Sequence, residues 1–361
     1  MTVNGGVSFW WQQHGVPDAR PALPGDLTVD VAIVGAGYTG LWAAYYLKTH
    51  QPDLRVAVLE QRFAGFGASG RNGGWLTNTV TGGRDRYERS HGRAAAEEQQ
   101  RALNDTVDEV VRVAAEHGID AGIHKGGELN VARSAAQLRR LKDAFQAEQS
   151  WPHTDVELLD ADATADRIRI NSAIGSVWHP HCARLNPAQL AAGLAATVER
   201  LGVIIYENTH VTEIRAGEAI TEHGTVTAEH VIRATEGFTA NLRRHHREWL
   251  PMNSSMIVTE PLPADFWRDI GWADNDTLGD FAHVYMYAQR TADDRIAFGG
   301  RGIPYRFGSH VDTDGDTQPQ TIRGLTALLR EFFPAAQDAR IDHAWSGVLG
   351  VPRDWAASVG L

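Results

Sequence analysis

The sequence contains a single cysteine, Cys182, among its 361 residues. One cysteine cannot form an internal disulfide, and it excludes zinc or iron–sulfur sites built from several cysteines. Histidine is more common, with 16 residues, but it clusters tightly only at His179-Pro180-His181 and His245-His246. Neither cluster has the helical i, i+4 spacing with an acidic partner that favours a metal site. We therefore expect no metal.

Positive charge and long apolar runs are also scarce. Lys and Arg total 34 against 45 Asp and Glu, which gives a formal net charge of -11. This negative charge disfavours sequence-independent binding to the phosphate backbone of nucleic acids. Apolar runs end well before the ~18 positions that a membrane helix needs. Residues 1–28 show no basic segment followed by an apolar stretch and a cleavage site. The sequence therefore predicts a cytoplasmic protein with neither a nucleic-acid nor a membrane partner.

What the sequence does contain is typical of a globular protein of two domains. Its composition is 43% hydrophobic and 22% charged, and its length allows about one domain per ~150 residues. A long helix is predicted from about Arg93 to His117. A second helix is predicted after Asn186, which can cap it, because Pro187 follows and Gly202 can end it. Short strands are predicted at 203–206, 211–214 and 231–234, and mostly strands from Met256 onwards.

A glycine motif, Gly35-Ala36-Gly37-Tyr38-Thr39-Gly40, lies between a predicted strand at 30–34 and a predicted helix at 38–50. A second strand at 56–59 ends at Glu60, which completes a βαβ unit and indicates a parallel sheet. The glycines allow a tight turn, close approach to a diphosphate, and packing of helix on strand. Glu60 can bind both ribose hydroxyls and would repel a 2′-phosphate. The motif alone leaves NAD and FAD open.

The segment Gly67-Ala68-Ser69-Gly70-Arg71-Asn72-Gly73-Gly74 favours FAD. It places backbone amides, a hydroxyl and a guanidinium along an extended cofactor, and its glycines leave room for a broad ring. With these motifs the sequence resembles the D-amino-acid oxidase-like (DAO) superfamily of FAD-dependent amine oxidoreductases, in the branch that contains gamma-glutamylputrescine oxidase. The resemblance extends to Ser8-Phe9-Trp10, to the runs at 179–194, 233–237 and 295–302, and to the run at 347–360.

The resemblance implies an α/β fold with a Rossmann-like FAD-binding domain of the GR2 type, whose parallel sheet is interrupted by a mixed or antiparallel substrate-domain sheet. The implied parts are an FAD-binding domain at 1–90 and 181–250, a helical and substrate-domain insertion at 91–180, a substrate-domain sheet at 251–345, and the start of a return to the FAD domain at 346–361. Family members continue past the position of Leu361 with a strand–helix segment, so the chain is expected to be truncated and its FAD site open on one side.

The resemblance also implies which residues bind FAD. They comprise the glycine motif, the end of the second strand, the glycine-rich segment and two later strand ends. The residues are Gly35, Gly37, Tyr38, Thr39, Gly40, Glu60, Gln61, Ala68, Ser69, Arg71, Asn72, Gly73, Gly74, Val211, Ala234 and Thr235.

Three residues are candidates for positioning substrate: Tyr285, Tyr287 and Arg301. Strand alternation over 283–289 predicts a polar and aromatic face with both tyrosines, opposite a face with Val284 and Met286. The tyrosines could wall a cavity for an amine through cation–π contacts, or they could be ordinary half-buried sheet residues. The guanidinium of Arg301 suits a substrate carboxylate, or it could form a surface ion pair.

The predicted function is oxidation of the C–N bond of a small amine or amino acid, with a polyamine derivative favoured, by hydride transfer to flavin N5. O2 is a candidate electron acceptor. In several related amine oxidases, a lysine near the flavin assists the reaction with oxygen. This sequence contains only three lysines that could have that role: Lys48, Lys125 and Lys142. Oxidase and dehydrogenase therefore both stay open. The alternatives are a truncated, non-catalytic flavin-binding protein and an NAD-dependent dehydrogenase, which the glycine-rich segment argues against.

Overall fold

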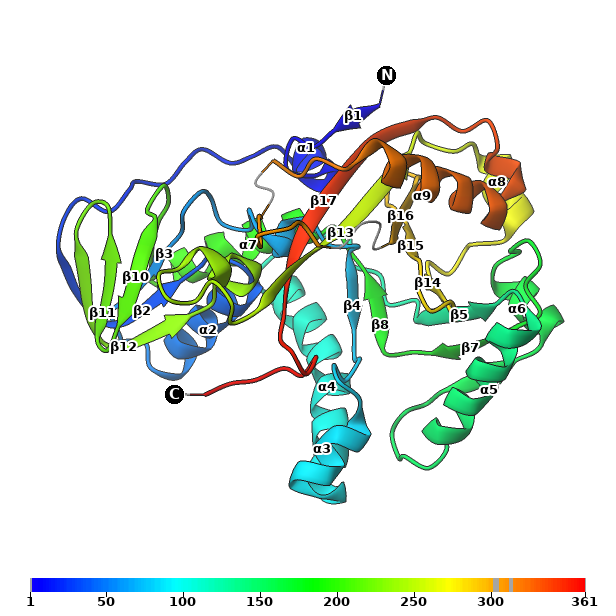
Figure 1. The fold of residues 1–361 in the computed structure, drawn as a ribbon, viewed down its shortest axis with the longest axis horizontal. Coiled ribbons are helices and arrows are strands. Elements are labelled where there is room, and N and C mark those ends of the chain that lie inside the picture. Colours follow the sequence, from blue (N-terminus) through cyan, green and yellow to red (C-terminus); the bar gives the residue numbers. More distant parts are fainter. Residues whose placement is uncertain (1, 301–304, 312–313, 361) are drawn as a thin grey trace.

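The computed structural model describes residues 2–300, 305–311 and 314–360. Arg301, one of the three substrate candidates, lies outside the described residues. The described chain forms two large sheets, which Figure 1 shows on opposite sides of the molecule. Two long strands of one sheet, β13 (Leu250–Thr259) and β17 (Ile341–Val351), run through the centre of the view. The predicted α/β architecture, with one largely parallel sheet and one mixed sheet, is confirmed.

The six-stranded sheet contains the predicted βαβ unit. Its central strands pair in parallel, and two antiparallel strands extend one edge. The strand order is β10 (Val211–Arg215), β11 (Glu218–Thr221), β12 (Thr225–Arg233), β2 (Leu27–Val34), β3 (Val56–Leu59) and β9 (Ile204–Tyr206). The predicted strand at 56–59 is confirmed to the residue, and the strand predicted at 30–34 begins three residues earlier.

Two helices cover one face of this sheet, α2 (Tyr38–His50) and α7 (Pro187–Arg200). Alternate residues of β2 divide between the faces: Val31 and Ile33 pack in the core with α2 and α7, whereas Ala32 and Val34 pack in the core on the opposite face. Asn186 caps α7 as predicted, because its side chain accepts hydrogen bonds from the N–H groups of residues 188 and 189.

The nine-stranded sheet is mostly antiparallel. Its order is β1 (Val3–Asn4), β17, β13, β16 (Ile296–Gly300), β15 (Tyr287–Arg290), β14 (Thr277–Asp280), β5 (Glu128–Ala132), β7 (Gly175–His179) and β6 (Glu157–Leu159). The predicted boundary between residues 345 and 346 falls inside β17, which pairs with β13 along its whole length. All of the predicted domain limits stay a prediction.

Different helices pack on the two faces of this sheet. Helices α8 (Ala264–Ile270) and α9 (Pro319–Phe332) bury their apolar side chains in one core with Ile257 of β13. On the other face, α1 (Phe9–His14) packs against Met256 and Val258 of the same strand. Helices α5 (Ala135–Glu148) and α6 (Ala161–Arg167) lie at the β7 end (Figure 1).

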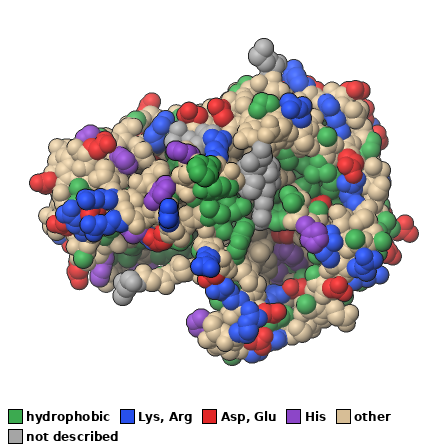
Figure 2. Space-filling model, viewed as in Figure 1, with side chains coloured by type: hydrophobic (Ala, Val, Ile, Leu, Met, Phe, Trp, Pro, Cys, Tyr) green, Lys and Arg blue, Asp and Glu red, His purple; other side chains and the backbone are tan. Residues whose placement is uncertain are grey.

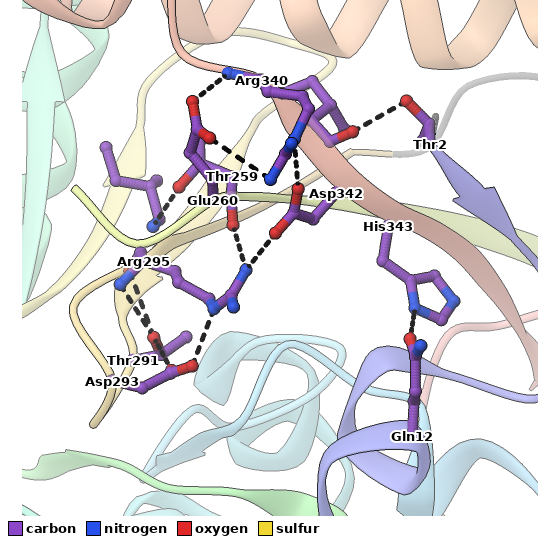
Figure 3. A network of polar contacts seen from close by, with 12 residues as sticks. Thr2, Gln12, Thr259, Glu260, Thr291, Asp293, Arg295, Arg340, Asp342 and His343 are labelled. Atoms are coloured by element: carbon purple, nitrogen blue, oxygen red, sulfur yellow. Dashed lines mark hydrogen bonds and ion pairs between the residues drawn. The ribbon is translucent and has the colours of Figure 1, made fainter.

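A network of hydrogen bonds and ion pairs connects the ends of β13, β16 and β17. Figure 3 shows Arg295 at its centre, with its guanidinium bonded to Asp293 at 2.7 Å, to Asp342 at 2.6 Å and to the Thr259 carbonyl at 2.9 Å. Since these groups come from two strands and the turn before β16, the network fixes how the strand ends meet.

A two-stranded ribbon lies between the large sheets, formed by β4 (Trp75–Thr77) and β8 (Cys182–Arg184). Below it in Figure 1 stand α3 (Arg84–His91) and α4 (Arg93–Glu116). The long helix predicted from Arg93 is therefore confirmed. Within the described residues, no helix has both the length and the apolar character needed to cross a bilayer.

Candidate cofactor and substrate site

A cleft opens at the carboxyl ends of β2 and β3, where α2 begins. Gly35 has a φ of 104° and approaches Ala234 so closely that a Cβ would lie 2.5 Å from its carbonyl oxygen. A Cβ on Gly40 would overlap the carbonyl oxygen of Gly35. Only glycine fits these two positions, which explains the spacing of the motif. The first turn of α2, which has no side-chain cap at Gly37, faces the cleft.

Most of the predicted cofactor residues line this cleft, called the glycine cleft below. They are Gly35, Gly37, Tyr38, Thr39, Glu60, Gln61, Ala68, Ser69, Val211, Ala234 and Thr235. The lining also includes residues that the sequence did not single out, among them Arg62, Phe66, His210 and Phe238. No sequence pattern marks these four, because they reach the cleft from three separate segments of the chain.

Glu60 lies at the carboxyl end of β3, with its side chain among the lining residues of the cleft. Its carboxylate accepts hydrogen bonds from the N–H groups of Ala36 at 2.9 Å and Arg62 at 3.0 Å. Burial raises the pKa of Glu60, and these two backbone donors oppose that shift. A carboxylate has about four lone-pair positions, so two remain for hydroxyl donors such as those of a ribose.

A second cavity, of about 230 Å³, adjoins the glycine cleft and shares Ala68 with it. We call it the tyrosine cavity. It is lined by Ala68, Arg71, Asn72, Gly73, Met252, Asn253, Ser254, Tyr285, Tyr287, Gly347, Leu349, Val351 and Trp355. The fold therefore brings two predicted substrate residues together with four residues of the glycine-rich segment.

The two tyrosines differ in their surroundings. The Tyr287 hydroxyl and the Ser254 hydroxyl lie 2.6 Å apart, and the Tyr287 ring packs edge-on against Trp75. Tyr285 is 44% exposed. Figure 2 shows hydrophobic side chains gathered at the centre of this face, where Figure 1 places the ends of β13 and β17. The tyrosine cavity therefore combines an aromatic hydroxyl with an apolar surround.

The strand predicted over 283–289 is shorter than expected. β15 begins at Tyr287, and residues 281–286 form a turn in which the Asp280 carboxylate accepts the N–H of Met286 at 3.1 Å. Val284, predicted on the apolar face opposite the tyrosines, lies outside the strand and is 68% exposed. Within the strand itself the alternation holds, since Tyr287 lies toward the glycine-rich segment and Ala288 in the opposite core.

Donors from distant segments hold the carbonyl groups of the glycine-rich segment. The Ser8 hydroxyl donates to Gly70 at 2.7 Å, the Trp10 indole to Asn72 at 2.8 Å, and the Trp345 indole to Arg71 at 2.8 Å. The Gln289 amide donates to Gly73 at 2.7 Å. Ser8 and Trp10 lie in a run shared with the family, and strand alternation places Gln289 on the same face as Tyr287, whereas the sequence offered no reason to select Trp345.

The side chains of Arg71 and Asn72 shape this same segment. Arg71 is buried, donates from Nε to the Phe66 carbonyl at 2.7 Å and stacks over the Phe66 ring. The Asn72 amide accepts the N–H of Gly74 at 2.7 Å and donates to the Ser69 carbonyl at 2.9 Å. Both side chains thus support the turn, while Asn72 and Gly73 themselves border the tyrosine cavity.

None of the three lysines is among the described residues that line either cavity. Lys48 donates to the Leu54 carbonyl at 2.9 Å, and Lys125 pairs with Asp108. Cys182 is fully buried beside Thr277, with Sγ 3.3 Å from its hydroxyl, which agrees with a packing role.

Comparison with known proteins agrees with the geometry of both cavities. The family described as FAD dependent oxidoreductase (DAO) matches residues 30–360. Gamma-glutamylputrescine oxidoreductase of Escherichia coli (strain K12) is 30% identical over 331 residues, which cover 89% of this chain and 74% of that protein. Glycine oxidase of Geobacillus kaustophilus (strain HTA426) is 28% identical over 88% of this chain and 80% of its own length.

Solved structures share the fold. L-proline dehydrogenase from P. horikoshii superposes with a TM-score of 0.75 at 18% identity, over 94% of this chain and 85% of that one. Glycine oxidase from Geobacillus kaustophilus gives a TM-score of 0.71 at 21% identity, over 92% and 86% of the two chains. The glycine cleft, with its obligate glycines, helix start and buried carboxylate, fits the diphosphate and ribose of FAD. The chain belongs to the DAO family of FAD-dependent oxidoreductases, and FAD is its cofactor.

Proposed function

We propose that this protein oxidises the C–N bond of a small amine or amino acid, with the substrate held in the tyrosine cavity. The observation that carries the proposal is that Tyr285 and Tyr287 line one cavity together with Asn72 and Gly73 of the glycine-rich segment. When bound, FAD supplies the acceptor for the hydride that leaves the carbon next to nitrogen.

The residues of the chain have the task of binding and orienting the amine. The aromatic faces of Tyr285 and Tyr287 attract an ammonium group, and the paired hydroxyls of Tyr287 and Ser254 can accept its hydrogen bonds. Met252 and Leu349 supply apolar walls that exclude water from the reacting carbon. Tyr287, with its hydroxyl already positioned, is the leading candidate for contact with substrate.

For the cofactor, we propose that the predicted residues of the glycine cleft bind the ADP half of FAD. Glu60 is assigned to the ribose, the start of α2 to the diphosphate, and Val211 to the adenine. Asn72, Gly73 and Gly74 are assigned to the flavin ring, with Arg71 acting behind them as a support.

The names of similar proteins support an amine substrate. They include gamma-glutamylputrescine oxidoreductase, glycine oxidase and sarcosine oxidase subunit beta. We favour a polyamine derivative, because the first of these has the highest identity of the three. O2 as electron acceptor and the cytoplasm as location stay predictions from the sequence.

The test is anaerobic reduction of the bound flavin by a panel containing putrescine, N-acylated putrescines, glycine, sarcosine and proline, followed by absorbance. We expect at least one amine to bleach the flavin, and an N-acylated putrescine to do so fastest. A holoprotein that dithionite reduces but no amine reduces would contradict the proposal and favour a non-catalytic flavin-binding protein.

A further inference from the structure

A third cavity, of about 270 Å³, lies behind the glycine-rich segment and contains the side chain of Arg184 from β8. Gln289 also borders it, and the Gln289 amide donates to the carbonyls of Gly73 and Leu185 at 2.7 and 3.1 Å. The cavity is therefore separate from the tyrosine cavity, whose lining does not include Arg184 or Gln289.

Arg184 has no acidic partner within ion-pair distance among the described residues. Its Nη1 donates to the Gly122 carbonyl at 3.0 Å, while its Nε is buried and donates to no group in the described part of the chain. A partly buried guanidinium without a counterion is costly, because it has lost water without gaining a charge partner. In a chain where acidic residues outnumber basic ones by 45 to 34, this is notable.

The two carboxylates nearest the cavity are bonded to residues other than Arg184. Asp293, which lines it, already accepts the Thr291 hydroxyl at 2.7 Å and Arg295 Nε at 2.7 Å. Asp294 is paired with Arg290 at 2.6 Å. Burial lowers the pKa of Arg184, the charge of Arg290 lowers it further, and the charge of Asp294 opposes the shift. Among the described residues, Arg184 therefore has nearby carboxylates but none in direct contact with its guanidinium.

The remaining polar groups in the lining add N–H donors. Gln13, Asn186 and Gln189 all border the cavity. The Asn186 amide donates to the Gln13 carbonyl oxygen at 3.2 Å, which leaves the Gln13 NH2 group available for another acceptor. Gln189 lies in the first turn of α7, beside the groups that Asn186 caps. A guanidinium and two carboxamides are a donor set suited to an oxyanion.

We propose that this cavity binds a small oxyanion, either a carboxylate or inorganic phosphate, through Arg184 with Gln13 and Gln189. The bound anion supplies the counterion that Arg184 lacks. Gln289 lines the same cavity and donates a hydrogen bond to the Gly73 carbonyl. Anion binding therefore stabilises the glycine-rich segment through Gln289.

The experiment uses the holoprotein and three variants. Arg184→Gln removes the charge. Gln189→Glu places a carboxylate in the lining of the cavity and should fold readily, because Gln189 is only partly buried. Arg101→Gln is the matched control, since Arg101 is an exposed residue of α4 outside the cavity. Phosphate, acetate and chloride are titrated at constant ionic strength, with calorimetry and thermal unfolding as readouts.

We expect phosphate or acetate, but not chloride, to bind the parent with one-to-one stoichiometry and to raise its Tm. Binding should weaken about tenfold or more in Arg184→Gln and in Gln189→Glu, and stay unchanged in Arg101→Gln. A preference for phosphate identifies a tetrahedral ligand, and a preference for acetate identifies a planar one. Equal effects of all three anions on the parent, or unchanged binding in both cavity variants, would overturn the proposal. These readouts do not depend on amine oxidation.

Discussion

The indole Nε1 of Trp345 donates a 2.8 Å hydrogen bond to the carbonyl oxygen of Arg71, 274 positions earlier in the chain. Trp345 lies in β17 and is fully buried, and Arg71 belongs to the segment that we assign to the flavin ring. One strand of the mixed sheet therefore sets the orientation of a peptide group in the proposed flavin site.

We expect Trp345→Phe to loosen FAD binding, because the buried carbonyl of Arg71 would lose its donor. An unsatisfied buried acceptor costs ~1–3 kcal/mol. FAD dissociation measured by fluorescence provides the check. Trp249→Phe is the control, since the Trp249 indole forms no hydrogen bond among the described residues and instead lies over Arg233. Similar FAD retention in both variants would contradict the assignment of this bond to the cofactor site.

Glu60→Gln should weaken FAD binding more strongly than Glu229→Gln. The first substitution removes the charge that accepts the N–H groups of Ala36 and Arg62 in the glycine cleft. The second removes an exposed charge elsewhere. Loss of hydrogen bonds to a charged group costs ~1.5–3 kcal/mol, or roughly 10- to 150-fold in the dissociation constant. Equal dissociation constants for the two variants would place the ribose elsewhere.

Tyr287→Phe should slow anaerobic flavin reduction by about five- to tenfold while leaving the FAD content unchanged, since one hydroxyl contributes ~1 kcal/mol. The variant keeps the ring that packs against Trp75 and removes only the hydroxyl paired with Ser254. Stopped-flow absorbance measures the rate. Tyr46→Phe removes a hydroxyl that is bonded to Glu109 on the protein surface, and it should reduce at the parent rate. If Tyr287→Phe also reduces at that rate, the substrate is bound by another wall of the cavity.

His343 should make the protein less stable in acid. Burial lowers its pKa below the ordinary value of 6.5, although the Gly5 carbonyl, 2.7 Å from Nε2, opposes the shift. The lowered pKa favours the neutral ring in the folded protein, with Nε2 donating to the Gly5 carbonyl. Figure 3 shows the contact of the ring with the Gln12 side chain. The contribution of the neutral ring is complete above the unfolded pKa and is lost as the pH falls through the lower folded value.

Urea unfolding at several pH values between about 7 and 5 tests this expectation. The free energy of unfolding should decline with falling pH in the parent, and the decline should be smaller in His343→Gln. His230→Gln, which replaces an exposed histidine, should follow the parent. An identical decline in all three proteins would assign the acid sensitivity to other groups.

The sequence alone determined the elements whose information is local. The βαβ unit of β2, α2 and β3 was predictable because its glycines, its apolar runs and Glu60 all lie within about 30 consecutive residues, the usual length of such a unit. The cap at Asn186 was predictable for the same reason, since a cap depends on neighbours two and three positions away.

Tertiary structure alone decided how the site is assembled. Gln289 bonds to Gly73 across 216 positions, and the indole of Trp10 reaches Asn72 across 62. No periodicity encodes such pairs, because each depends on how two sheets and a helix pack. The late start of β15 has a similar cause: strand alternation extends through residues 283–286, but the carboxylate of Asp280 captures the Met286 N–H and turns the chain before a ladder can form. Local sequence patterns indicate which secondary structure neighbouring residues favour. Burial and long-range hydrogen bonds then decide which of the favoured structures forms.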